Sequence, residues 1–213
     1  MLKDNFQKMN GFHKKLGIFL LALTLILCGC RGHGDFSKDQ MRRMSIFISN
    51  FTELGMLNCN VRTLLDESNP HAMLDFSIRH NYFNNYNSSV ASCPLLDCPW
   101  GPLTMKGGAV QTSLKRYFDY DLPWLPSAEK GSPPYHFDGS LYHFTPPEKP
   151  GLVRFARVNR ARLTNEGLVK MRGEIYNAEN EKEILGTFKA VAKPHTWNGR
   201  KTWALVEIHT KER

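Results

Sequence analysis

The last third of the chain alternates between apolar and polar residues, which is the pattern of half-buried strands. Val169, Met171 and Ile175 fall on one face of such a segment, and Lys170 and Arg172 fall on the other. Four strands are predicted in all, over 152–163, 168–177, 184–193 and 202–209. Because short polar turns separate them, we expect an antiparallel meander with one apolar face.

Earlier in the chain, apolar residues recur every three or four positions, which predicts amphipathic helices. Ser37 followed by Gln40 is a capping-box pattern, so the first helix should begin there and end at Gly55. A second helix is predicted from Asn69-Pro70 to about Asn84, with Asn69 as its cap, and a third from Gly108 to Phe118. The segment between the second and third helices, Asn84 to Met105, is rich in Asn, Ser, Pro and Cys and is expected to be a loop.

Helices followed by an antiparallel sheet predict the α+β class, with about three N-terminal helices on a four- to five-stranded sheet. This element order resembles the NTF2-like and cystatin-like folds. We expect a single domain over 37–213. Within this domain we expect a helical part over 37–120, a proline-rich loop and hairpin over 121–151, and the sheet over 152–213.

The hairpin prediction depends on Asp138-Gly139, a typical two-residue turn between strands. With that turn, His136 and His143 are diagonal neighbours on one face. Two imidazoles can bind a transition metal. The pair is therefore a candidate metal site, although no third ligand is identifiable. The alternative is an aromatic hairpin packed on the domain.

The N-terminus carries four lysines before an apolar run from Leu16 to Leu27. Twelve residues are too few for a membrane-spanning helix, which needs roughly 20. A basic start followed by a short apolar run is typical of a secretory signal peptide. Translation could begin at Met1 or at Met9.

The run ends in Leu27-Cys28-Gly29-Cys30, which resembles the lipobox of bacterial lipoprotein precursors. Cys28 departs from the pattern, because a small residue is usual there. The resemblance implies a signal peptide over 1–29, cleavage between Gly29 and Cys30, lipid on the Cys30 thiol and a lipidated tether over 30–36. It implies an exported protein anchored to the bacterial membrane, facing the periplasm on the outer membrane if the host has two. The alternative is release as a soluble protein.

The chain has 28 Lys+Arg and 20 Asp+Glu, a net charge of +8. Cleavage would remove four lysines and one aspartate and leave +5. Residues 151–213 contain 13 basic and 7 acidic residues, so the excess lies on the predicted sheet. A basic run on the first predicted strand consists of Arg154, Arg157, Arg160 and Arg162, and we expect Lys170, Arg172 and Lys189 to extend it across the sheet. This face suits an anionic polymer, lipid headgroups or an acidic envelope protein, or is simply solvated; nucleic acid is not expected as a partner outside the cytoplasm.

The chain has five cysteines, of which Cys59, Cys93 and Cys98 lie in the predicted domain. Exported proteins mature under oxidising conditions. A Cys93–Cys98 disulfide is therefore the preferred prediction, with Cys59 free and buried. The alternative pairs Cys59 with one of the other two. Four intervening residues are unusual for a redox pair, and no second Cys or His pair at short spacing follows to complete a metal site.

No motif of a serine, cysteine or P-loop enzyme is present, so no catalytic residue and no cofactor are predicted. Two polar-aromatic clusters at helix ends form the candidate ligand site, consisting of Arg79, His80, Tyr82 and Tyr117. Taken together, the sequence predicts an envelope lipoprotein that acts by binding. The alternative is an envelope hydrolase or metal-dependent enzyme that uses His80 or the His136/His143 pair.

Overall fold

The computed structural model describes residues 36–66, 71–121 and 127–213. The predicted signal peptide, the Cys30 lipidation site and the Asn69-Pro70 helix start lie outside these ranges. Residues 36–213 form one compact unit that combines helices with antiparallel strands, so the α+β class is confirmed. Within the described ranges, no helix has the length and apolarity needed to span a membrane.

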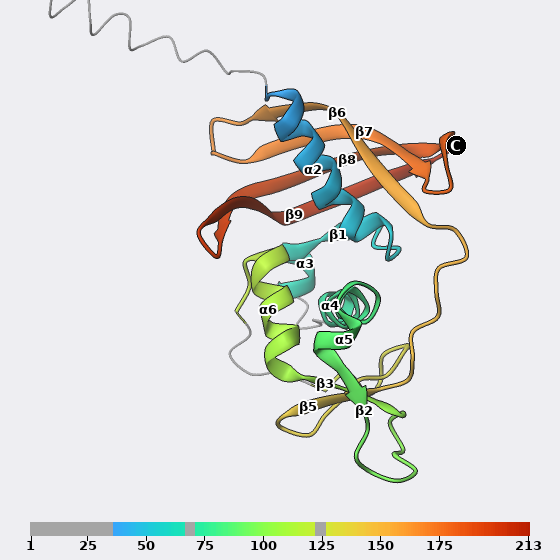
Figure 1. Cartoon of the computed structure of the whole chain (residues 1–213). Helices are drawn as coiled ribbons and strands as arrows, with labels where there is room; N and C mark the ends of the chain where they lie inside the picture. The colour runs from blue at the N-terminus through green and yellow to red at the C-terminus, as the bar shows by residue number, and fades with distance from the viewer. Residues whose placement is uncertain (1–35, 67–70, 122–126) are drawn as a thin grey trace, which may run out of the picture. The chain divides into compact units, whose positions relative to one another are not determined.

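The larger sheet has five antiparallel strands in the order β1-β9-β8-β7-β6 (Figure 1). Their bounds are β1 Cys59–Asn60, β6 Arg154–Leu163, β7 Val169–Asn177, β8 Asn180–Trp197 and β9 Arg200–Glu212. The predicted meander is confirmed, with β8 and β9 longer than the alternation indicated. Val169, Met171 and Ile175 are buried on one face, as predicted.

Helix α2 (Lys38–Thr52) lies along the larger sheet beside β6 (Figure 1). The capping box is present, since Ser37 Oγ accepts the Gln40 N–H at 3.2 Å and Gln40 Oε1 accepts the Ser37 N–H at 2.8 Å. Ser49 Oγ accepts the N–H of Ala156 at 2.9 Å. Because β6 is an edge strand, such hydroxyl contacts satisfy backbone groups that have no neighbouring strand.

A second sheet, not predicted from the sequence, has the order β2-β3-β5-β4. Its strands are β2 Val90–Ser92, β3 Leu103–Lys106, β4 His136–Phe137 and β5 Leu141–Phe144. The expected loop before residue 105 therefore contains two short strands. Strand β3 of this segment pairs with β5, which belongs to the predicted hairpin. The proline-rich segment and the cysteine-containing segment therefore share one sheet.

The remaining helices join the two sheets. They are α3 Val61–Asp66, α4 His71–Asn84, α5 Tyr86–Ser89 and α6 Gly107–Phe118. Helix α4 packs mainly against α6, and α6 contacts β3 and β9, so α2 makes the main helical contact with the larger sheet. Phe51 of α2 stacks on Phe76 of α4 at 4.8 Å between ring centroids, and Phe118 of α6 packs edge-on against both. One aromatic cluster thus connects the elements of both sheets.

Candidate metal centre

The connection between β2 and β3 is a loop that carries both Cys93 and Cys98. The Cys93 N–H donates to the Pro102 carbonyl at 2.8 Å, which closes the loop. Gly101 has a φ of +121°, and a Cβ there would lie 2.4 Å from the Phe144 carbonyl carbon. A glycine at this position therefore lets the loop pack directly against the backbone of β5.

This packing brings His143 of β5 to the two cysteines. His143 Nδ1 lies 3.4 Å from Cys93 Sγ and 3.4 Å from Cys98 Sγ. All three atoms lie within 4.8 Å of one another. His143 is 1% exposed and the cysteines are half-buried, so the group sits beneath the loop. We call Cys93, Cys98 and His143 the Cys-Cys-His centre.

Asp138 holds the other side of the histidine ring. Its Oδ1 accepts the N–H groups of Ser140 and Leu141 at 2.8 and 2.7 Å, which fixes the carboxylate in the hairpin turn. Its Oδ2 lies 2.9 Å from His143 Nε2. Because an ionised carboxylate only accepts hydrogen bonds, Nε2 carries the proton in the neutral ring. The lone pair of Nδ1 then faces the two sulfur atoms.

Electrostatics at the centre favour the charged forms of Asp138 and Cys98, whereas burial and the neighbouring Cys98 raise the pKa of Cys93. The hydrogen bond from His143, together with those from Leu141 and Ser140, lowers the pKa of Asp138 to about 2. Burial acts to raise the pKa of Cys98, but hydrogen bonds from the Trp100 N–H and Cys93, together with the hydrogen bond and positive charge that a protonated His143 offers, outweigh burial and lower the pKa. Burial opposes a charge on His143, yet Asp138 and Cys98 raise its pKa. A cation between Cys98 and His143 would replace the proton that these two groups attract.

The sulfur–nitrogen spacing is close to that of a tetrahedral zinc site. Zinc bonds of about 2.3 Å to sulfur and about 2.0 Å to nitrogen place a sulfur and a nitrogen ligand about 3.6 Å apart. The two observed separations are 3.4 Å. Thiolate and imidazole suit Zn²⁺ or Cu⁺, whereas Mg²⁺ and Ca²⁺ prefer oxygen. A carboxylate on the far nitrogen is the usual support of a metal-binding histidine.

His136, the other half of the predicted histidine pair, has a different environment. The hairpin register differs from the prediction: Gly139 and Ser140 are the central turn residues, so His136 is paired directly with His143. The His136 ring stacks on Trp100 at 3.6 Å and 6°, and its Nδ1 lies 2.6 Å from Glu129 Oε1. Of the two histidines, His143 is the one that meets the cysteines.

The predicted ligand cluster of Arg79, His80, Tyr82 and Tyr117 is divided by the structure. His80 and Tyr117 meet in the core, with His80 Nε2 3.0 Å from Tyr117 Oη. His80 is 4% exposed, and burial together with the Arg116 charge lowers its pKa to about 4. Tyr82 instead packs edge-on against Phe83. His80 and Tyr117 are therefore core residues.

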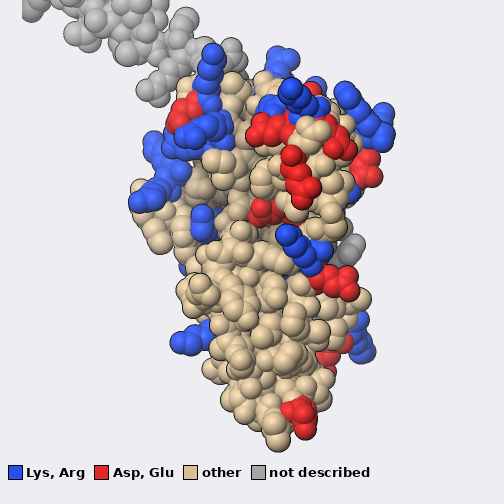
Figure 2. All heavy atoms as spheres, turned by 45° about the vertical axis from the view of Figure 1, so that its right-hand side comes forward, with Lys and Arg blue, Asp and Glu red and all other residues tan. Residues whose placement is uncertain are grey.

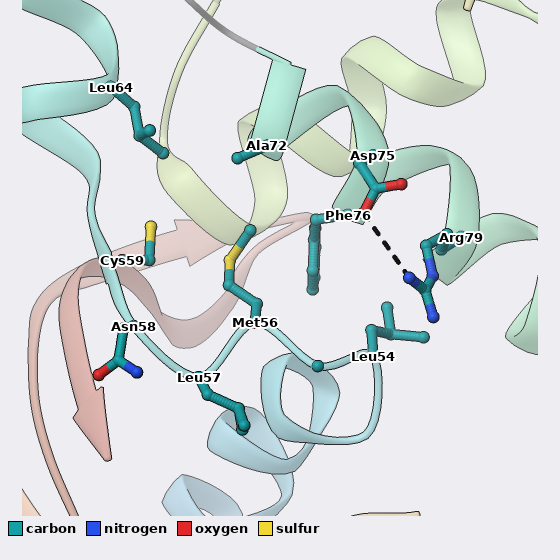
Figure 3. A pocket seen from close by; sticks show the side chains of 11 residues that line it. Leu54, Met56, Leu57, Asn58, Cys59, Leu64, Ala72, Asp75, Phe76 and Arg79 are labelled. Carbon is teal, nitrogen blue, oxygen red and sulfur yellow. Dashed lines mark ion pairs between the residues drawn. The ribbon is translucent and has the colours of Figure 1, made fainter. Parts of the chain in front are cut away.

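Arg79 points into a pocket of about 340 Å³ between the end of α2, β1 and α4 (Figure 3). Its guanidinium lies 3.9 Å from Asp75, whose other oxygen accepts the Tyr135 hydroxyl at 2.6 Å. The pocket wall is otherwise mainly apolar and includes Phe76 and Leu54. Arg79 and His80 are adjacent on a helix and so do not share a face.

Cys59, Cys93 and Cys98, the three cysteines of the described ranges, are free thiols in this structure. The Cys93–Cys98 disulfide expected from the sequence is not present here and stays a prediction. Cys59 is buried in β1, and burial raises its pKa to about 11. The contact between the cysteine pair and His143 could not be predicted from local spacing, because His143 follows Cys98 by 45 residues. Only the pairing of β3 with β5 shows that they meet.

No protein-family model, curated protein or solved structure matches this chain. The interpretation of the Cys-Cys-His centre therefore rests on its own geometry.

Proposed function

We propose that this chain is a membrane-anchored lipoprotein whose folded domain binds Zn²⁺ at the Cys-Cys-His centre. The observation that carries the metal site is the orientation of His143. Asp138 holds Nε2 at 2.9 Å, and Nδ1 faces both sulfurs at 3.4 Å. A disulfide has no need of a histidine so aligned, whereas a metal ion does.

The membrane anchor is proposed from the N-terminal residues. A basic start, a 12-residue apolar run and Leu27-Cys28-Gly29-Cys30 together support export and lipid attachment at Cys30. Each buried methylene of an acyl chain contributes about 0.8 kcal/mol to membrane binding. The anchor would hold the domain at the bacterial membrane, on its extracytoplasmic side.

The anchor is tested with a Cys30→Ser variant expressed in a bacterial host. We expect the unmodified chain in the membrane fraction and the variant either unprocessed or released. A Cys59→Ser variant, which changes a thiol outside the lipobox, serves as the control. Normal processing and membrane retention of Cys30→Ser would contradict the lipoprotein proposal.

The metal site is tested on the purified full-length chain after reduction and loading with zinc. Metal analysis should give one zinc per chain for the unmodified protein and none for the Cys93→Ser/Cys98→Ser double variant. Cys59→Ala, which removes the thiol outside the centre, should retain the metal. With Co²⁺ as the probe, thiolate charge-transfer bands should appear and should vanish in the double variant.

The same experiment separates the metal site from the predicted disulfide, because both use Cys93 and Cys98. Peptide mapping of the protein isolated under alkylating conditions shows whether these thiols are linked. Zinc at one equivalent with both thiols reduced supports the proposal. A reduced protein that takes up no zinc would contradict the metal-site proposal, and a disulfide would then be the better explanation for Cys93 and Cys98.

A metal-dependent hydrolase is the second candidate function, favoured by the number of protein ligands. Three ligands leave one position of a tetrahedral zinc ion for water, as in catalytic zinc sites. The His136 ring lies 5.8 Å from that of His143 and its Nδ1 is hydrogen-bonded to Glu129, so His136 is a candidate base. Ester hydrolysis by the zinc-loaded chain that is lost in His136→Gln, with zinc retained, would establish this activity.

The resemblance to NTF2-like and cystatin-like folds is proposed for the larger sheet alone. A helix lying along an antiparallel meander supports it. The smaller sheet and the Cys-Cys-His centre would then be additions to that fold.

A further inference from the structure

Two rows of cations cross the outer face of the larger sheet. Arg160 on β6 is paired with Arg172 on β7, which is paired with Lys189 on β8. Two positions along the strands, Arg162 is paired with Lys170. We call these five exposed residues the cationic rungs. Like charges directly opposite each other destabilise an antiparallel sheet, so a bound anion would stabilise this arrangement.

A β-bulge places the first strand of the rungs in this orientation. Val158 is buried, so regular alternation would point Arg160 toward the core and Ala161 outward. The register shift between Val158 and Arg160 reverses this, leaving Ala161 buried and Arg160 exposed. Gly173 lies opposite the bulge, where a Cβ would meet the Arg157 carbonyl oxygen at 1.9 Å. Bulges commonly redirect side chains at functional sites.

Within the described ranges, none of the rung side chains has an ion pair or a side-chain hydrogen bond. The contrast lies on the same sheet, where Arg157 reaches Glu181 at 3.4 Å and Glu174 at 3.9 Å. Glu207 lies two strands beyond Lys170 and already contacts Asn60 at 3.4 Å. The rungs are thus an uncompensated cluster beside a compensated one.

Four of the rung residues converge on one shallow hollow of about 110 Å³, lined by Arg160, Arg162, Lys170 and Arg172. Guanidinium groups bind phosphate oxygens through paired hydrogen bonds, and lysine adds a point charge. Two rungs can engage two neighbouring phosphates. We propose that the cationic rungs bind a polyanion that carries successive phosphate groups.

A phosphate-bearing polymer fits this surface better than a lipid bilayer does. Membrane-docking surfaces combine cations with apolar side chains that enter the acyl region. The exposed large hydrophobic residues of the described ranges are Ile46, Tyr86, Leu95, Leu96 and Leu163. None belongs to the rungs, and Leu163 follows Arg162 on a strand, so it points to the opposite face. The proposal is independent of the metal site, which lies on the other sheet.

Charged side chains gather over the part of the molecule that holds the larger sheet, on the face shown in Figure 2. The end that holds the smaller sheet shows few of them on that face. A test must therefore separate the rungs from the general positive charge of this part. Arg200 and Lys201 provide the control, because they line a different hollow on the same sheet.

The probe is inorganic triphosphate, titrated into the purified full-length chain by calorimetry at about 150 mM salt. Arg160→Gln/Arg172→Gln should weaken binding about tenfold or more. Arg200→Gln/Lys201→Gln removes the same charge and should stay within about twofold of the unmodified chain. Triphosphate should also raise the Tm of the unmodified chain and not that of the rung variant, which shows that the rung variant is folded and unbound.

Three results would overturn the proposal. One is an unmodified chain that does not bind triphosphate, and another is equal weakening in both double variants, which indicates a general charge effect. The third comes from flotation with anionic phospholipid vesicles, using chain that carries Cys30→Ser to remove the anchor. Vesicle binding that depends on the rungs, without triphosphate binding, would assign the surface to a membrane instead.

Discussion

Asp138 supports the proposed metal site without being one of its ligands. Its Oδ1 is fixed by the N–H groups of Ser140 and Leu141, so an Asp138→Asn amide keeps its oxygen there. The amide NH₂ then takes the place of Oδ2 and donates to His143 Nε2. That contact moves the ring proton to Nδ1, where it faces the two sulfurs.

Zinc affinity of Asp138→Asn should therefore fall about 10- to 100-fold, which is the usual effect of losing such a support. Competition with a chromophoric chelator measures it. Asp97→Asn changes an exposed carboxylate of the same loop, whose φ of +55° asparagine tolerates, and should leave the affinity unchanged. Equal affinities in the two variants would show that Nδ1 is not a ligand.

His80 makes the second prediction at this scale, because it is a buried histidine with a pKa lowered to about 4. The unfolded state, with a pKa near 6.5, binds the proton first as the pH falls. Stability is therefore present above about pH 6.5 and is lost as the pH falls toward 4. From pH 7 to pH 5 this group should remove about 2 kcal/mol from the free energy of unfolding.

Urea unfolding at both pH values checks this contribution. In His80→Gln the loss between pH 7 and pH 5 should shrink by about that amount, although the variant is less stable throughout because packing on Phe76 changes. His209→Gln, at an exposed histidine, is the comparison. The same pH dependence in both variants would mean that His80 takes up its proton in the folded state.

At the scale of elements, the parts predicted from the sequence are those with local signals. The capping box at Ser37 and the alternation of β7 depend on neighbouring residues only, and both are confirmed. Strands β2 and β3 have three and four residues, too few for a period to be visible. Their stability comes from the pairing of Leu103 with Phe144, forty-one positions later, which no local pattern contains.

The hairpin register shows the same limit in one turn. Asp138-Gly139 and Gly139-Ser140 are both typical turn pairs. The structure has the second pair at the centre of the turn. Asp138 is therefore the last residue before the turn, where its side chain accepts hydrogen bonds from the Leu141 N–H and from His143 Nε2. The observed register thus comes with side-chain contacts of Asp138 inside the hairpin, which the turn pair alone does not contain, and it sets the position of His143.

The bulge of β6 gives a prediction for an element. Gly173→Ala places a methyl group against the Arg157 carbonyl, so the strands must separate or the bulge must move. We expect a loss of roughly 1 to 3 kcal/mol in the free energy of unfolding by urea. Gly108→Ala lies in α6 with open space around its Cβ and should be neutral or stabilising by up to about 1 kcal/mol. Similar values for both variants would remove the requirement for glycine at the bulge.

At the scale of the molecule, the two proposed sites lie on different sheets, and both sheets contribute to one hydrophobic core. The Cys-Cys-His centre belongs to the smaller sheet and the cationic rungs to the larger one. Phe51, Phe76 and Phe118 connect them through ring contacts of 4.8 to 5.8 Å. If this cluster makes the domain unfold as one unit, a ligand at either site stabilises both sheets.

That reasoning predicts additive ligand effects on a single thermal transition. Zinc or triphosphate at a free concentration of about 100 times its Kd should each raise the free energy of unfolding of the full-length chain by about 2.7 kcal/mol. Both ligands together should raise it by about twice as much. Calorimetric scans of the full-length chain measure this. Cys93→Ser/Cys98→Ser should lose only the zinc shift, and Arg160→Gln/Arg172→Gln only the triphosphate shift. Two separate transitions, each moved by one ligand, would instead show that the aromatic cluster does not couple the two sheets.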